Sequence, residues 1–293
     1  MPSFTASLYR LLLRAKKLPN NSSVPNSVKW FRDMNLQTPH PILLGKCKFA
    51  GSVMHGVPLV TITPPLPADD KTILFLHGGG FVGGPHLLHW IMAARIATAA
   101  NCRLVAVNYP LAPETVFPDA LNLIQQIYLH LRPQHKQIIA LGDSAGGNLA
   151  TALTLKLRDE NLPMPDKLAL ISPALDLNLE NPDIDELEKA DAMLNRQALK
   201  TLRGAYAGNT PLTHQYVSPL FAPLHNLPPT LLLCGSAELF YPDCRLFAQK
   251  VQECGGNISF YTGNQMFHDW TLFPLLPEAA KAIAKIGEFV KEG

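Results

Sequence analysis

Residues 142–146 carry the clearest chemical signal in the sequence, because Gly-Asp-Ser-Ala-Gly matches the pattern G-x-S-x-G. An apolar run over 137–141 precedes this pattern, and a helix-like stretch follows it. A strand–turn–helix of this kind holds a serine hydroxyl above a sheet, and the start of its helix offers a free backbone N–H at Ala145. A glycine-rich turn with an incidental serine, or a phosphate loop, is the alternative. We predict that Ser144 is a nucleophile.

A second glycine-rich turn, His77-Gly78-Gly79-Gly80, follows the apolar run over 72–76. Successive glycines expose backbone N–H groups without a side chain in the way, so they can stabilise a negative charge that develops on oxygen. Alone, such a run is often a flexible turn, but beside a serine elbow it is typical of lipases and esterases. We expect His77 to make a structural hydrogen bond there.

A serine nucleophile needs a base, and the base needs an orienting acid. In folds with such an elbow the chain order is serine, acid, histidine. Of the ten histidines, His268 alone lies beyond the last predicted strand, so we predict that it is the base. Activity should then rise as this imidazole loses its proton, roughly across pH 6–8.

The orienting acid has several candidates. Glu238 follows an apolar run over 230–234, where a loop could bring its carboxylate to the histidine, and we favour it. Asp243 stands at the expected start of the next helix, where helix capping would explain it. Asp176 follows the preceding strand and competes with Glu238, whereas Asp269 adjoins the histidine and cannot easily reach its Nδ1.

The elements that would position these residues alternate along the chain. Short apolar runs separated by helix-like stretches predict a parallel sheet with helices on both faces. The first two runs, around His55 and Gly56, predict an antiparallel hairpin at one edge of this sheet. The predicted strands are 46–53, 57–63, 72–76, 103–107, 137–141, 168–172, 230–234 and 257–261. The predicted helices between or after them are 86–100, 119–131, 147–160, 242–254 and 277–291.

One interval interrupts this alternation. More than fifty residues separate the strand that ends at Ser172 from the strand that begins at Thr230. Helices are expected within it over 183–190 and 196–206. An excursion of this length from a sheet usually carries a lid or a binding element.

The first seventeen residues predict an amphipathic helix, and residues 20–27 predict a loop by composition. We expect the helix to dock on the body of the protein by its apolar face. Contact of this basic helix with a membrane surface is the alternative that we do not favour. The apolar face comprises Phe4, Leu8, Leu11, Leu12 and Ala15, and the opposite face comprises Ser7, Arg10, Arg14 and Lys17.

The composition of the 293 residues fits a globular protein with a large core. Charged residues make up 16% and hydrophobic residues 47%, which opposes disorder. The net charge of +2 gives no indication of a nucleic-acid partner. The five cysteines form no C-x-x-C pair, so we expect no metal site, reduced thiols and a cytoplasmic location. No apolar run reaches the roughly 18 residues of a membrane span, and the N-terminal run is too short for a signal peptide.

Four motifs in combination resemble the hormone-sensitive-lipase-like family of α/β-hydrolase carboxylesterases. They are the HGGG turn, the GDSAGGNLA elbow, the tract Asn108-Tyr109-Pro110-Leu111-Ala112-Pro113-Glu114 and the tract Phe267-His268-Asp269-Trp270, all within residues 70–291. The resemblance implies Ser144 as nucleophile, His268 as base and Glu238 as acid. It further implies that the oxyanion donors are Gly79, Gly80 and Ala145. We expect no cofactor.

The same resemblance implies an α/β-hydrolase fold, with a mostly parallel central sheet flanked by helices and covered by a helical cap. The cap segments are expected to be 1–45 and 175–217, and the two parts of the core 46–174 and 218–293. Pro110 stands where family members usually have an arginine that often pairs with the following glutamate. We therefore expect a structural role for Glu114.

The function implied is a serine carboxylesterase that hydrolyses short- to medium-chain carboxylic esters through an acyl-enzyme. A lipase or an amidase/deacetylase would use the same triad. A non-catalytic small-molecule receptor of the same fold is less favoured, because such receptors would be expected to lose a triad residue. The expected partner is a small-molecule ester, and an exposed sheet edge would also allow a homodimer.

Overall fold

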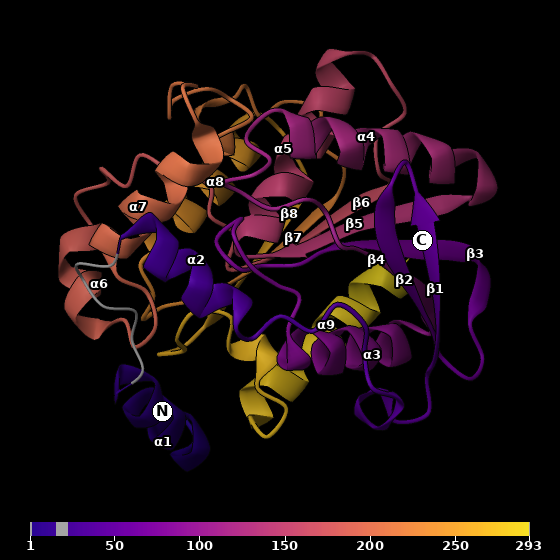
Figure 1. Ribbon diagram of the computed structural model, residues 1–293, viewed down its shortest axis with the longest axis horizontal. Coiled ribbons are helices and arrows are strands. Elements are labelled where there is room, and N and C mark those ends of the chain that lie inside the picture. The colour runs from indigo at the N-terminus through magenta and orange to yellow at the C-terminus, as the bar shows by residue number, and fades with distance from the viewer. Residues whose placement is uncertain (1, 16–22, 293) are drawn as a thin grey trace.

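The computed structural model describes residues 2–15 and 23–292, and Figure 1 shows a sheet with helices on both sides. Within these residues, eight strands form one sheet in the order β1-β2-β4-β3-β5-β6-β7-β8. β1 and β2 form the predicted antiparallel hairpin, β2 is antiparallel to β4, and the other neighbouring pairs are parallel. The strands are β1 (Lys48–Met54), β2 (Val57–Thr63), β3 (Ala68–Leu76), β4 (Cys102–Val107), β5 (Gln137–Asp143), β6 (Lys167–Ile171), β7 (Thr230–Gly235) and β8 (Ile258–Gly263).

Helices cover both faces of this sheet, which explains why its central strands are apolar along their whole length. In β5, Ile138 and Ala140 belong to one core, whereas Ile139 and Leu141 belong to the other. The first core lies under α4 (Asp119–Leu131), α5 (Ala145–Asp159) and α8 (Tyr241–Glu253), and the second under α3 (Leu87–Ala100) and α9 (Pro277–Lys291). The predicted parallel sheet with helices on both faces is therefore confirmed.

Three further helices gather at one side of the molecule (Figure 1). They are α2 (Val24–Arg32), α6 (Ile184–Ala190) and α7 (Arg196–Ala207), and α2 packs against α7 although many residues separate them in the sequence. The two helices predicted in the long interval are thus confirmed.

The loop predicted over 20–27 is wrong from residue 24 onward, and residues 20–22 lie outside the described part of the chain. The side chain of Ser23 accepts a hydrogen bond from the backbone of Asn26, and Pro25 stands in the first turn of α2. Both features are typical of a helix start, and the Asn- and Ser-rich composition before them concealed it.

The prediction that the first helix, α1 (Phe4–Ala15), docks by the face with Phe4, Leu8, Leu11 and Leu12 is wrong, because a third face, with Ala6 and Tyr9, packs on the body. Phe4 is 85% exposed, whereas Ala6 is buried. The Tyr9 ring lies edge-on to the Phe273 ring, with 4.9 Å between the ring centroids. The backbone N–H and the hydroxyl of Ser3 donate to the carboxylate of Glu278, at 2.7 and 2.9 Å. A small residue and a polar anchor therefore decide how the helix docks. The Ala15 side chain and Lys17 lie outside the described residues.

Candidate active site

Ser144 occupies a sharp turn between β5, which ends at Asp143, and α5, which begins at Ala145. Its backbone lies at φ 50° and ψ −117°, which non-glycine residues rarely adopt. Two hydrogen bonds hold the turn, since Ser144 N donates to Ile171 O at 2.9 Å and Ser144 O accepts from Ala174 N at 3.1 Å. The turn therefore presents Oγ at the carboxyl edge of the parallel strands.

The two glycines that flank this turn are required by its geometry. A Cβ on Gly146 would overlap the carbonyl oxygen of Leu76, and a Cβ on Gly142 would overlap the carbonyl oxygen of Gly146. Both overlaps involve backbone atoms, so no rotation of a side chain could relieve them. The small residues expected from the motif thus allow the close approach that the elbow needs.

The imidazole of His268 lies between Ser144 and Glu238. Its Nε2 is 2.9 Å from Ser144 Oγ, and its Nδ1 is 2.5 Å from Glu238 Oε2. Glu238 follows β7 and His268 follows β8, so all three side chains come from the same edge of the sheet. All three are buried, which limits competition from water. The structure brings together the three residues that the sequence analysis singled out.

The second carboxylate oxygen of Glu238 has three donors of its own. Oε1 accepts from the backbone N–H of Gly235 at 2.6 Å, from the hydroxyl of Ser172 at 2.8 Å and from the thiol of Cys234 at 2.8 Å. Three donors on one oxygen fix the plane of the carboxylate and leave Oε2 for the imidazole. The sequence analysis missed Ser172, whose only local signal is its place directly after β6.

The competing carboxylates have other partners. Asp243 Oδ1 accepts from the side-chain amide of Asn181 at 2.7 Å, which ties α8 to the long segment after β6. Asp176 Oδ1 accepts from the backbone N–H of Asn178 at 2.7 Å and closes a local turn. Of the candidates for the orienting acid, Glu238 is the one that lies at Nδ1 of the imidazole.

Asp269 faces the other nitrogen of the same imidazole. Its Oδ2 lies 3.1 Å from His268 Nε2, the atom that also faces Ser144, so the expectation that Asp269 does not reach Nδ1 is met. Burial lowers the pKa of His268, but the carboxylates of Asp269 and Glu238 outweigh this and raise that pKa well above its usual value. Burial raises the pKa of the Asp269 carboxyl to about 7, although the neighbouring His268 acts to lower it.

The glycine turn after β3 lies beside the serine elbow. Gly79 and Gly80 have φ values of 123° and 61°, which side chains rarely allow. Among the described residues, no acceptor is bonded to the backbone N–H groups of Gly79, Gly80 or Ala145. For Ala145 this follows from its place in the first turn of α5, where helix geometry supplies no acceptor. These three amide donors are therefore free, and Gly80 and Ala145 line the same pocket as Ser144.

His77 holds this turn in place through a hydrogen bond and a ring contact. Its Nδ1 lies 2.8 Å from Gly78 O, and its ring stacks on Tyr109 with centroids 4.4 Å apart. The hydroxyl of Tyr109 in turn donates to His77 O at 2.6 Å. Burial and the neighbouring His89 lower the pKa of His77 to about 3, so the imidazole is neutral at physiological pH. These contacts agree with the structural hydrogen bond that we expected.

Arg32, at the end of α2, binds backbone carbonyl groups next to the glycine turn. Its Nε donates to Val82 O at 3.0 Å and its Nη2 to Ala112 O at 3.0 Å. The guanidinium also forms a two-bond ion pair with Glu114, at 2.9 and 2.5 Å. Glu114 therefore does have an arginine partner, supplied by α2 and not by position 110. The sequence analysis missed Arg32 because nothing near it marks a contact so far along the chain.

Asp143, directly before the nucleophile, links three elements of the site. Its carboxylate accepts from the backbone N–H of Gly78, and its Oδ2 lies 3.1 Å from Nε2 of His89 on α3. Burial lowers the pKa of His89 to about 3, so this imidazole is a neutral donor. Asp143 thus fixes the glycine turn to the serine elbow, a role that the G-x-S-x-G pattern alone does not indicate.

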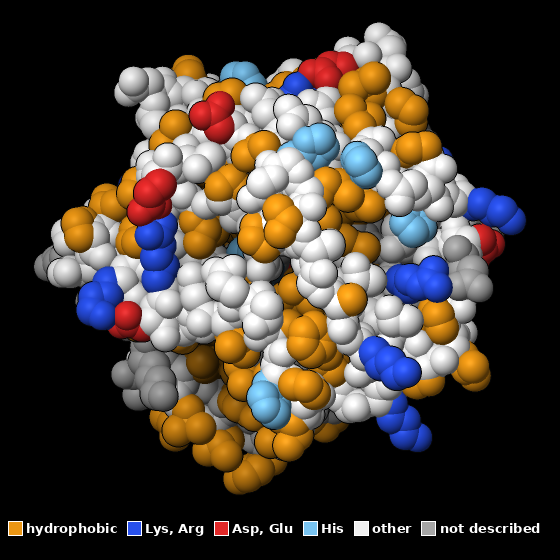
Figure 2. Space-filling view, turned by 45° about the vertical axis from the view of Figure 1, so that its right-hand side comes forward, with side chains coloured by type: hydrophobic (Ala, Val, Ile, Leu, Met, Phe, Trp, Pro, Cys, Tyr) orange, Lys and Arg blue, Asp and Glu red, His pale blue; other side chains and the backbone are white. Residues whose placement is uncertain are grey.

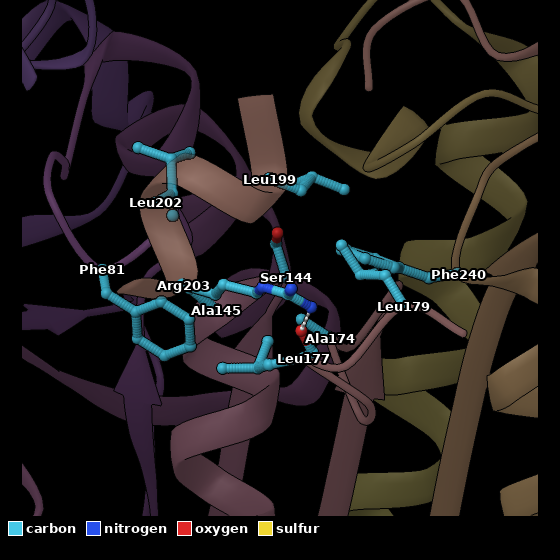
Figure 3. Close-up of a pocket in the computed structure, with 11 residues that line it drawn as sticks. Phe81, Ser144, Ala145, Ala174, Leu177, Leu179, Leu199, Leu202, Arg203 and Phe240 are labelled. Atoms are coloured by element: carbon cyan, nitrogen blue, oxygen red, sulfur yellow. Dashed lines mark hydrogen bonds between the residues drawn. The ribbon is translucent and has the colours of Figure 1, made fainter. Parts of the chain in front are cut away.

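A small apolar pocket opens beside Ser144 (Figure 3). Leu199 and Leu202 of α7 lie above the serine, and Leu177 lies below it. The pocket has a volume of about 30 Å³ and is partly open to solvent. Its lining residues are Gly80, Phe81, Ser144, Ala145, Ala174, Leu177, Leu179, Leu199, Leu202, Arg203 and Phe240.

Aromatic residues contribute less to this pocket than they do to the core. Phe81 and Phe240 line it, and the Phe81 ring stacks on the Tyr206 ring with 3.8 Å between the ring centroids. Trp90, Phe117 and Tyr206 are buried in the core, and Phe221 is half exposed on the surface.

The described residues contain no group of three or more His, Cys, Asp or Glu side chains placed to hold a metal ion. None of the described helices has both the length and the hydropathy needed to cross a bilayer.

Comparisons with known proteins agree with the motifs. A family model described as alpha/beta hydrolase fold matches residues 73–272, which include all four motifs. An esterase of Acinetobacter venetianus is 37% identical over 229 residues, covering 75% of this chain and 74% of that protein. An acetyl-hydrolase of Streptomyces hygroscopicus is 32% identical over 231 residues, covering 78% and 77%. A crystal structure of an esterase from the bacterial hormone-sensitive lipase family superposes with a TM-score of 0.90 at 29% identity, covering 99% of this chain and 98% of that one.

Proposed function

This chain belongs to the α/β-hydrolase fold family, and from that premise we propose that it is a serine carboxylesterase for short- to medium-chain esters. The observation that carries the proposal is the continuous contact from Glu238 through His268 to Ser144, at 2.5 and 2.9 Å. A buried carboxylate, an imidazole and a hydroxyl in this order are what activates a serine for attack on a carbonyl. Relatives that are named esterase and acetyl-hydrolase support the same reaction.

The first half of the reaction acylates the serine. Neutral His268 takes the proton from Ser144 Oγ as this oxygen attacks the ester carbonyl, and Glu238 stabilises the imidazolium that forms. The carbonyl oxygen becomes negative and is met by the free N–H groups of Gly79, Gly80 and Ala145. The imidazolium then gives its proton to the alkoxide as the ester C–O bond breaks, so the alcohol leaves.

The second half of the reaction restores the enzyme. Water loses a proton to His268 and attacks the acyl carbon, and the same three N–H groups stabilise the second tetrahedral oxyanion. When this intermediate collapses, His268 returns the proton to Ser144 Oγ and the carboxylic acid is released. The cycle needs no cofactor, because each proton removed at one step is returned at the next.

The pocket beside Ser144 supports a preference for small acyl groups. A volume of about 30 Å³ is small against the roughly 300–1,000 Å³ of typical ligand pockets, so a short acyl group fits it best. Longer acyl chains would require Leu199 or Leu202 of α7 to move. We expect acetate esters to be hydrolysed fastest, with turnover that falls as the acyl chain grows.

The segments 1–45 and 175–217 form a cap on the core in this proposal. The packing of α2 on α7 joins the two segments, and Leu202 brings α7 to the pocket. The core parts, 46–174 and 218–293, carry every residue of the triad and of the oxyanion donors. Chemistry and selection of the acyl chain would then come from different parts of the chain.

Hydrolysis of p-nitrophenyl esters from acetate to palmitate tests this proposal, with the purified wild type and Ser144→Ala. We expect wild-type turnover to be highest on the short esters and Ser144→Ala to lose at least about 10⁴-fold in kcat. An active Ser144→Ala variant would reject Ser144 as the nucleophile. A folded wild type that hydrolyses none of the esters and does not react with a fluorophosphonate probe would overturn the esterase assignment.

A further inference from the structure

We infer that α1 docks the protein on the surface of an anionic lipid bilayer through an outward row of apolar side chains. The row consists of Phe4, Leu8, Leu11 and Leu12, which are 85%, 46%, 67% and 55% exposed. Their spacing of three and four residues places them along one side of the helix. This inference does not depend on the reaction that the active site performs.

The other side of α1 is already occupied by the body of the protein. Ala6 is buried, Tyr9 packs on Phe273, and Ser3 is bonded to the carboxylate of Glu278 at the start of α9. These contacts hold the helix so that its apolar row faces away from the core. A bilayer could therefore be contacted without any rearrangement of the fold.

The row is a cluster and not a scatter of single exposed residues. Four of the twelve large hydrophobic side chains that are exposed in the described residues lie on this one twelve-residue helix. Figure 2 shows hydrophobic side chains gathered at the lower edge of the molecule, where α1 projects in Figure 1. Single exposed apolar residues are normal on a protein, but a contiguous group marks a surface that binds something.

The charge of the helix identifies the occupant as an anionic lipid surface. Phe4–Ala15 contains no acidic residue and two basic ones, Arg10 and Arg14, in a chain with 25 basic and 23 acidic residues. Lys16 and Lys17 follow directly in the sequence. An apolar row with a basic flank is the composition of helices that lie at the headgroup level of anionic membranes.

A second copy of the chain fits the apolar row of α1 less well, because α1 is positively charged. A symmetric pair would oppose α1 with α1 and bring the same basic residues of both copies together. Like charges at such a contact oppose association, whereas anionic headgroups attract them. The helix lies at the lower edge of the molecule (Figure 1), where a flat lipid surface can reach it.

Sedimentation of the full-length protein with lipid vesicles tests this inference. The vesicles contain either phosphatidylcholine alone or phosphatidylcholine with 30% phosphatidylglycerol (roughly the anionic content of a charged leaflet). We expect binding to the anionic vesicles that weakens severalfold on raising the salt from about 0.05 to 0.5 M. The double variant Leu8→Gln/Leu11→Gln should bind at least about tenfold more weakly.

Two matched controls separate this surface from general hydrophobicity. Val53→Gln and Ile42→Gln replace exposed apolar residues elsewhere, and both should bind vesicles like the wild type. All variants should keep the melting temperature and the wild-type rate on p-nitrophenyl acetate, because none of these residues touches the active site. If the wild type shows no turnover, the vesicle result still stands, since it measures binding alone.

Three outcomes would overturn the inference. The wild type could fail to bind anionic vesicles at low salt, or the double variant could bind them as well as the wild type does. A wild type that is dimeric by light scattering, with Leu8→Gln/Leu11→Gln monomeric and no vesicle binding by either, would assign the row to a second copy of the chain.

Discussion

The site around Ser144 has a sheet side, made by residues that follow β5, β7 and β8, and a cap side, made by α7 and the segment before it. On the sheet side, Ser144, Glu238 and His268 are buried and each is fixed by hydrogen bonds of 2.5–3.1 Å. On the cap side, Leu199 and Leu202 contribute apolar surface without hydrogen bonds of their side chains. The sheet side therefore fixes the orientation of the reacting groups, and the cap side limits the volume of the pocket.

This difference separates two kinds of effect that a substitution can have. A displaced hydrogen-bonding group on the sheet side changes the transition state of every ester alike, so kcat falls uniformly. A changed apolar surface on the cap side alters which acyl chains fit, so the ratio between esters moves. The comparison is testable because each substitution can be measured on a short and a long ester.

The largest effect is expected for Glu238→Gln on the sheet side. The amide no longer stabilises the imidazolium and can hold His268 in the wrong tautomer, so kcat should fall by about 10³–10⁴-fold. The loss should be the same on p-nitrophenyl acetate and hexanoate. Asp243→Asn, a buried carboxylate near by that bonds Asn181, should stay within about threefold of the wild type. Equal losses in the two variants would contradict the assignment of the acid.

Leu202→Ala on the cap side should change selectivity. Removing three side-chain carbons from the pocket makes room for longer acyl chains, so the hexanoate-to-acetate ratio of kcat/KM should rise at least about tenfold. Leu187→Ala, on α6 and outside this pocket, is the matched control and should leave the ratio unchanged. Because a ratio is independent of the amount of folded enzyme, loss of stability cannot mimic the result. A uniform loss on both esters would contradict the division of roles.

The sheet side is also the part that local sequence patterns predicted well. Short apolar runs and the turns after them determine the strands, and the chain order of serine, acid and histidine follows from the elbow. Glu238 was preferred to Asp243 because it lies nearer the end of its strand, and the geometry at Nδ1 agrees. Ser172, which bonds Glu238 from 66 positions away, has only its place directly after β6 as a local signal, and this does not indicate its partner.

The N-terminal helices were harder to predict than α6 and α7, for physical reasons that differ from helix to helix. The side chain of Ser23 and Pro25 start α2 within a stretch whose composition suggested a loop. In α1 the larger apolar row, which includes Phe4 and Leu11, faces outward, because a tightly packed alanine and a bond to Glu278 decide the docking. Periodicity shows that a helix has two faces but not which face the rest of the chain will cover.

Asp269→Asn should shift the pH dependence with little change in the plateau. A histidine whose pKa is raised stays protonated to higher pH and cannot accept the serine proton, so activity is lost as the pH falls through that pKa. Removing the charge of Asp269 lowers the pKa of His268, so the acid limb of kcat/KM should move to lower pH. On that limb, the variant should keep a severalfold larger fraction of its own plateau activity than the wild type keeps of its plateau.

The control for this shift is Asp176→Asn, which removes another buried carboxylate that does not contact the imidazole. Profiles of kcat/KM from pH 5 to 9 on p-nitrophenyl acetate distinguish the two variants. An acid limb that stays in place in Asp269→Asn, or moves upward, would show that Asp269 does not stabilise the imidazolium. The hexanoate-to-acetate ratio of kcat/KM should not change, as we expect for a residue of the sheet side.

The smallest effect, and the sharpest test of the comparison, is expected for Arg32→Gln. Arg32 belongs to α2, in the segment that we propose as the N-terminal part of the cap, yet its donors reach Val82 O and Ala112 O next to the glycine turn. Loss of these bonds should loosen the amides of Gly79 and Gly80, so kcat should fall about three- to tenfold on acetate and hexanoate alike. Glu114→Gln removes only the partly exposed ion pair and should stay within about twofold. If Arg32→Gln changes the hexanoate-to-acetate ratio of kcat/KM, Arg32 acts as a residue of the cap side, as its place in the chain suggests. If activity on both esters falls equally, Arg32 acts through the backbone atoms that it contacts on the sheet side.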